Sequence, residues 1–177
     1  MRIINTLFAI LLSATTSRLS AVETFAAGHA PALDPHPDVW INSAPLDWPA
    51  LEGKVVLLNV WTYGCGNCQR SLPWLSSVRA KYRLRGFEIV AVHSPEFPWE
   101  RSRSAVAVAV EEHGIGWPVM LDNGLRYWTA LGNRYWPAFY IVDRHGRIAG
   151  RFVGETHAYD GRAGSMERLI EKLLNEG

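Results

Sequence analysis

The sequence KVVLLNVWTYGCGNC, residues 54–68, decides the fold. Its first eight residues are apolar apart from Lys54 and Asn59 and rich in β-branched side chains, and the run is too short for a helix core. We therefore predict a strand that is buried on both faces of a sheet. Cys65 and Cys68 follow this strand directly, at the carboxyl end where α/β sheets commonly hold their reactive groups.

A helix is expected after the cysteine pair. From Asn67 to about Arg85, apolar side chains recur near helical spacing, and Gly86 follows where a C-terminal cap would stand. Pro73 should kink this helix, because proline removes one backbone hydrogen bond and crowds the preceding turn.

Strands and helices alternate along the rest of the chain. The patterns predict strands at 87–92, 119–121, 138–142 and 147–153, and helices at 101–112, 125–131 and 165–174. The last two strands flank a polar turn, as in a hairpin. This order indicates an α/β fold, with a central mixed β-sheet that has parallel middle strands, an antiparallel edge and flanking helices.

Composition bounds the function. The chain has 177 residues, 48% of them hydrophobic and 20% charged, which is typical of one globular domain. Its 18 basic and 17 acidic residues leave a formal net charge of +1. Because nucleic-acid binding needs a basic surface, we expect no nucleic-acid partner.

The N-terminus has the pattern of a secretory signal. Met1 and Arg2 precede about ten mostly apolar residues, a run too short to cross a bilayer core that needs about 20. We predict a signal peptide over 1–25 with cleavage between 21 and 30, a Pro-rich leader over 26–39 and one domain over 40–177. The protein is then periplasmic or otherwise extracytoplasmic, with a membrane tether through an uncleaved N-terminus as the alternative.

The spacing of the two cysteines indicates redox chemistry. A thiol is nucleophilic only as its thiolate, and unpaired backbone N–H groups at a helix start favour that negative charge. Cys65 stands at the predicted helix start and is therefore the expected nucleophile. Cys68, three residues on along the same face, is placed to resolve a mixed disulfide at Cys65, and Gly66 keeps the approach open.

Two other interpretations of the cysteine pair are less consistent with the sequence. A zinc site needs two further ligands at matching spacing, and the six histidines form no HxxxH pair, so we expect no metal site. A structural disulfide across so short a loop would add little stability, because that benefit grows with loop length.

Several motifs resemble the thioredoxin-like family. They are WTYGCGNC at 61–68, GFEIVAV at 86–92, HSPEF at 93–97 and YWTALGNRYWP at 127–137. Together they are similar to the exported TlpA and ResA type of thiol-disulfide oxidoreductase and to the soluble redox domain of DipZ-type proteins. The resemblance implies a thioredoxin fold with a helix and a strand inserted between the second central strand and a cis-proline. It also implies a redox-active disulfide, Cys65–Cys68, and no separate cofactor.

The same resemblance implies further site residues. Pro137 occupies the place of the family's cis-proline, and the backbone of Trp136 would pair with an extended substrate segment. Gly66 and Asn67 would contact the same substrate. The supporting residues that precede the motif are Trp61 and Thr62.

Two departures from the family pattern leave the proton acceptor of Cys68 open. Asn59 stands where plain thioredoxin has a buried Asp, and Ser71 stands where ResA-like chains often carry a Glu. Our hypothesis for this role is Glu96, which lies beside His93 after the second predicted central strand.

We predict an exported enzyme that reduces or exchanges disulfides in partner proteins. The resemblance implies protein disulfides as substrates, with apocytochrome c as one substrate class, and a separate membrane thiol donor as the source of electrons. We expect a monomer.

Two other functions stay open. Thr62 to Cys65 matches the Thr-x-x-Cys part of the peroxiredoxin motif, although Leu58 stands where that family needs Pro, so a thiol peroxidase is one alternative. The other is a Cu(I)-binding module, because a CxxC pair can hold Cu(I) and the predicted leader carries His29 and His36.

Overall fold

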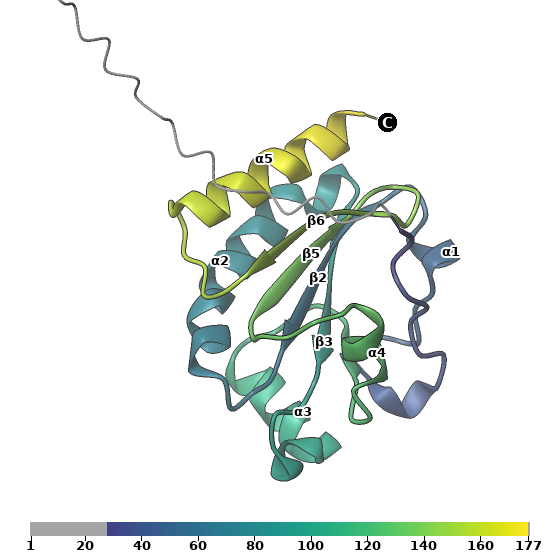
Figure 1. Ribbon diagram of the computed structural model, residues 1–177, viewed down its shortest axis with the longest axis vertical. Coiled ribbons are helices and arrows are strands. Elements are labelled where there is room, and N and C mark those ends of the chain that lie inside the picture. Colours follow the sequence, from purple (N-terminus) through teal and green to yellow (C-terminus); the bar gives the residue numbers. More distant parts are fainter. Residues whose placement is uncertain (1–27, 177) are drawn as a thin grey trace, which may run out of the picture.

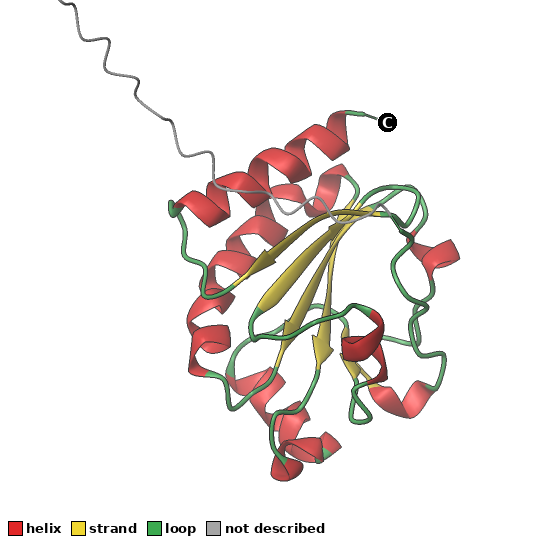
Figure 2. Cartoon of the chain, in the orientation of Figure 1, coloured by secondary structure: helices red, strands yellow, loops and turns green. Residues whose placement is uncertain are grey.

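A computed structural model of the protein describes residues 28–176. One six-stranded sheet forms its centre, with the strand order β1-β4-β3-β2-β5-β6. Helices cover both faces of this sheet (Figure 1, Figure 2). The arrangement confirms the predicted α/β class with a central mixed sheet.

The middle of the sheet is its parallel part. The strands are β1 (Trp40–Ile41), β2 (Val55–Trp61), β3 (Phe87–His93), β4 (Val119–Leu121), β5 (Ala138–Val142) and β6 (Ile148–Val153). β2 runs parallel to β3 and antiparallel to β5, and β4 runs parallel to β3. β1 and β6 close the two edges in antiparallel pairings. All seven residues of β2 are buried, which confirms a strand covered on both faces.

The longest helix follows β2 directly. The α-helices are α1 (Trp48–Leu51), α2 (Gly66–Tyr82), α3 (Arg103–Glu112), α4 (Arg126–Ala130) and α5 (Gly161–Asn175), and the 3-10 helices are η1 (Pro37–Val39), η2 (Arg83–Arg85) and η3 (Pro98–Arg101). α2 continues through Pro73. Gly86 has a φ of 84° after η2, so the helical stretch ends at the residue predicted as its cap.

Alternating side chains of β2 divide the core into two layers. Val55 and Leu57 belong to the layer that packs under α2, α3 and α5. Val56 and Leu58 belong to the opposite layer, with residues of α1, α4 and the N-terminal segment. Because both faces of β2 are covered, the chain returns to the surface only past the strand's carboxyl end, at the exposed Gly64.

An insertion separates β3 from β5. It contains η3, α3, β4 and α4, and it ends at Pro137, one residue before β5. This agrees with the expected helix and strand between the second central strand and the proline.

The N-terminal segment packs against the domain from residue 28 on. The Ala30 amide donates to the Gly146 carbonyl at 2.9 Å, and the Leu33 side chain is buried. Part of the predicted leader therefore belongs to the fold. The predicted signal peptide lies outside the described residues. Among the helices of residues 28–176, none has the length and apolar character that crossing a bilayer requires.

Candidate active site

The two cysteines form a disulfide at the start of α2. Their Cα atoms are 5.2 Å apart, and Cys65 is the N-cap of the helix. Its Sγ accepts a hydrogen bond from the Cys68 amide at 3.2 Å. Cys65 is half-buried whereas Cys68 is only 2% exposed. An incoming thiol or disulfide can therefore reach Cys65 from solvent, and Cys68 lies behind it.

Trp136 and Pro137 lie next to the disulfide-bearing end of β2. Val60 of β2 is paired with Ala138, the first residue of β5. The Trp136–Pro137 peptide bond just before it is cis. The Trp136 indole also contacts the loop after β3: its N–H donates to the Ser94 carbonyl at 2.9 Å.

A buried histidine stands behind the motif. His93, the last residue of β3, is fully buried, and its Nε2 lies 3.3 Å from the hydroxyl of the equally buried Thr62. The Tyr63 amide also points to this nitrogen, at 3.4 Å. Trp61 meets the His93 ring edge-on, with 5.3 Å between ring centroids. Thr62 and Trp61 thus support the loop through His93, a residue that the sequence interpretation noted without giving it a role.

Burial decides the protonation of His93. It lowers the pKa of the imidazole to about 4, although the Glu100 carboxylate nearby acts in the opposite direction. His93 Nδ1 has no hydrogen-bond partner among the described residues. The ring is therefore neutral at pH 7 and cannot supply a positive charge to the motif.

The acid that touches the motif is Glu100. Its side chain is fully buried, and one carboxylate oxygen accepts from the Gly64 amide at 3.1 Å. The other oxygen accepts from the amides of Glu96 at 2.6 Å and Phe97 at 3.1 Å. The side chain of Glu96 is exposed, and the carboxylate that contacts the loop before Cys65 is that of Glu100, four residues later. Glu96 as the proton acceptor of Cys68 stays a prediction. We call residues 93–100 the aromatic flank, because they include the stacked rings of Phe97 and Trp99.

A second set of polar groups borders the motif on its other side. Arg70 donates to Asn67, between the two cysteines, and forms two hydrogen bonds of 2.8 and 2.6 Å to Glu155. His157 Nε2 lies 2.6 Å from the same carboxylate. The hydrogen bonds from Arg70 lower the pKa of Glu155 to about 2. We call Arg70, Glu155 and His157 the charged flank, which the sequence interpretation missed because its members are far apart along the chain.

Ser71 has a structural contact in place of an acid. Its hydroxyl is buried, donates to the Asn67 carbonyl at 2.8 Å and accepts from the Thr156 amide at 3.0 Å. The side chain therefore joins α2 to the segment after β6. Asn59 is buried in β2.

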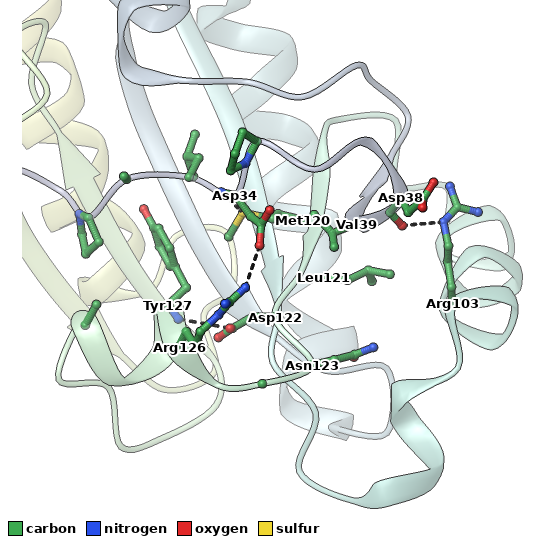
Figure 3. A pocket seen from close by; sticks show the side chains of 16 residues that line it. Asp34, Asp38, Val39, Arg103, Met120, Leu121, Asp122, Asn123, Arg126 and Tyr127 are labelled. Carbon is green, nitrogen blue, oxygen red and sulfur yellow. Dashed lines mark hydrogen bonds and ion pairs between the residues drawn. The ribbon is translucent and has the colours of Figure 1, made fainter.

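A cavity among the described residues lies away from the motif. It has a volume of about 840 Å³ between the N-terminal segment, β4 and α4, and no residue of the CxxC motif lines it. Figure 3 shows its charged side chains in contact with other lining residues: Arg126 with Asp34 at 3.0 Å, and Arg103 with the Asp38 carbonyl at 2.9 Å. Residues 28–176 contain no cluster of three or more His, Cys, Asp or Glu side chains fit to hold a metal ion.

The fold and site define a class of protein. A mixed sheet with a CxxC disulfide after its central strand, and a cis-proline beside that strand, is the arrangement of a thioredoxin-like redox protein. The redoxin family model matches residues 28–167, and the chain therefore belongs to this family.

Relatives and solved structures agree with that assignment. The chain is 37% identical over 140 residues to DipZ of Mycobacterium tuberculosis, covering 77% of this chain and 19% of DipZ. It is 30% identical over 126 residues to the thiol-disulfide oxidoreductase ResA of Halalkalibacterium halodurans, covering 70% of this chain and 62% of that protein. A crystal structure from Chlorobium tepidum, described as a candidate thiol:disulfide interchange protein DsbE, superposes with a TM-score of 0.70 at 24% identity, covering 84% of this chain and 96% of the other. These findings confirm the resemblance to the ResA and DipZ type. The chain spans only about a fifth of DipZ.

Proposed function

We propose that the protein is an extracytoplasmic enzyme that reduces or exchanges disulfides in partner proteins. The observation that carries this proposal is the Cys65–Cys68 disulfide, with one sulfur half-buried at a helix start and the other behind it. Location outside the cytoplasm is supported by the apolar run near Met1. The relatives named for thiol-disulfide exchange support the reaction type.

The reaction balances in two thiol exchanges. In the reduced enzyme, the Cys65 thiolate attacks one sulfur of the substrate disulfide, and the other substrate sulfur leaves as a thiolate that takes up a proton. The Cys68 thiolate then attacks Cys65 Sγ and releases the second substrate thiol. Two electrons pass from enzyme to substrate, and the enzyme is left as the disulfide. An external dithiol, in our proposal held by a separate membrane protein, returns two electrons for the next cycle.

The start of α2 and the Trp136–Pro137 segment each have a part in this cycle. The N-terminal dipole of α2 favours the Cys65 thiolate both as nucleophile and as leaving group. The backbone of Trp136, just before the cis-proline Pro137, would pair with an extended substrate segment that carries the disulfide. Apocytochrome c is one protein substrate to test.

Trapping the mixed disulfide tests the proposal. The Cys68→Ser variant should accumulate a covalent adduct at Cys65 with a disulfide peptide, detected by mass spectrometry, while the Cys65→Ser variant should form none. The wild-type enzyme should reduce the peptide repeatedly when dithiothreitol is supplied, and neither variant should. If the wild-type enzyme ignores disulfides but consumes hydrogen peroxide through Cys65, the peroxidase alternative replaces the proposal.

A further inference from the structure

Two exposed aromatic rings stand beside the redox motif. Phe97 is 42% and Trp99 is 65% exposed, and their rings stack in parallel with centroids 4.6 Å apart. One face of each ring is thus covered by the other ring, and both residues keep a large exposed area. A single exposed apolar side chain is ordinary on a protein surface, but an adjoining pair next to a reactive group indicates a contact site.

Hydrogen bonds hold this aromatic pair against the cysteine loop. The buried Glu100 carboxylate accepts from the Phe97 amide with one oxygen and from the Gly64 amide with the other. The Tyr63 hydroxyl donates to the Trp99 carbonyl at 3.2 Å. The rings therefore sit on a backbone that is fixed relative to Cys65, so little conformational freedom is lost when a partner contacts them.

We propose that Phe97 and Trp99 form a docking platform for protein segments that carry aromatic or large aliphatic side chains next to the cysteine of their disulfide. This inference rests on the proposed function, because disulfide exchange requires a partner segment to lie across the surface around Cys65. Of the two flanks of the motif, the one formed by Arg70 and Glu155 offers paired charges, and the aromatic flank offers apolar area. Burial of that area against apolar partner residues gives the enzyme a preference among disulfides that are otherwise chemically alike.

Three disulfides of different size and chemistry test the platform. Two are synthetic peptides of equal length and charge with one internal disulfide, flanked in one case by Phe and Leu and in the other by Ser and Gly. The third is hydroxyethyl disulfide, which has no apolar side chain to place on the rings. Turnover is measured with dithiothreitol as donor for the wild-type enzyme, for Trp99→Ala and for the Phe97→Ala/Trp99→Ala double variant.

The platform predicts a selective loss. The double variant should lose about five- to tenfold in kcat/KM for the Phe and Leu peptide, mainly through a higher KM, and Trp99→Ala should lose part of this. Rates with the Ser and Gly peptide and with hydroxyethyl disulfide should stay within about twofold of wild type. Leu84→Ala is the matched control, because Leu84 is 88% exposed in η2, outside both flanks, and its loss should change none of the three rates.

Each other outcome overturns the inference in a recognisable way. An equal loss with all three disulfides means that the substitutions damage the cysteine loop itself, and no loss with any of them means that the rings do not contact substrate. If sedimentation shows that the wild-type protein is a dimer and the double variant a monomer, the rings serve a second copy of the chain instead. If the wild-type enzyme reduces none of the three disulfides, the proposed function is wrong, and the platform, which rests on it, is overturned with it.

Discussion

The two flanks of the CxxC motif differ in where their charged side chains lie: one charge is buried, and the other flank has an ion pair near the surface. On the aromatic flank, Glu100 is fully buried and its carboxylate accepts hydrogen bonds from three backbone amides. On the charged flank, Arg70 and Glu155 meet each other near the surface, where the Arg70 side chain is 55% exposed. A buried carboxylate that loses its donors cannot turn to water, whereas the exposed Arg70 side chain can. The aromatic flank should therefore determine the stability of the loop, and the charged flank should only adjust its chemistry.

The largest expected effect is that of Glu100→Ala. The change leaves the amides of Gly64, Glu96 and Phe97 without their acceptor, and it should lower the free energy of unfolding by about 3 kcal/mol. Urea denaturation of the oxidised protein measures this. Glu112→Ala, at an exposed carboxylate that ends α3, is the control and should change stability by about 0.5 kcal/mol or less. Equal losses of stability in the two variants would mean that the buried Glu100 carboxylate does not stabilise the aromatic flank.

His93 makes the aromatic flank sensitive to acid. Its pKa is lowered to about 4 in the fold, against an ordinary value near 6.5, so between these pH values the unfolded chain binds a proton that the folded protein does not. Stability should therefore fall as the pH drops through this range, by at most about 1.4 kcal/mol per pH unit. His93→Gln should flatten the dependence, measured by urea denaturation from pH 7 to 4. His145→Gln, at an exposed histidine, should keep it, and an unchanged slope in His93→Gln would contradict the assignment.

Alanine substitutions at Gly64 and Gly66 test how rigid each flank is. A Cβ added to Gly64 would lie 2.2 Å from Oε1 of the buried Glu100, whose other carboxylate oxygen is held by two amides. A Cβ added to Gly66 would lie 3.1 Å from the end of the longer and more exposed Arg70 side chain. We expect Gly64→Ala to cost about 1–3 kcal/mol of stability and Gly66→Ala clearly less. Thermal unfolding of both variants ranks them. The reverse order would mean that the charged flank is the rigid one.

The smallest effects should come from the charged flank. Arg70→Gln removes a positive charge beside the motif, which disfavours the thiolate of the reduced enzyme and should shift the equilibrium with glutathione toward the disulfide by about twofold to fivefold. Glu155→Gln should shift it the other way. Both shifts should shrink at high salt, since exposed charges are screened. Lys81, farther along α2, forms a similar ion pair with Glu167 of α5. Lys81→Gln breaks that pair and should leave the equilibrium with glutathione unchanged.

Local sequence patterns predict most of the helices and strands. The elements that they miss or misplace have physical explanations. The apolar run of β2 and the spacing in α2 each specify an element by themselves. β1 has only two residues, so no alternation could reveal it; it exists because Trp40 and Ile41 pair with β4. α5 begins four residues before the predicted start, because Asp160 caps it and its first turn carries few apolar residues.

The site was predictable where its residues are neighbours in sequence. The order of Cys65 and Cys68 along the helix predicts which of the two reaches solvent, and the structure agrees. The contact of Glu100 with the Gly64 amide depends on how the loop after β3 folds back, and it joins residues 36 positions apart. The pairing of Arg70 with Glu155 spans 85 positions and has no local signal at all.

The N-terminal segment joins the domain at one end of the sheet, and this position determines where a tag or a label would lie relative to Cys65. The Ala30 amide donates a hydrogen bond to the Gly146 carbonyl in the turn between β5 and β6. In the same turn, the Arg144 backbone carbonyl accepts from the Gly53 amide, just before β2. Cys65 lies past the other end of that strand, which seven residues extend over about 20 Å. A fusion partner or an immobilising label attached ahead of residue 28 is therefore joined at the end of the sheet opposite the disulfide, and it leaves a macromolecular substrate free to approach.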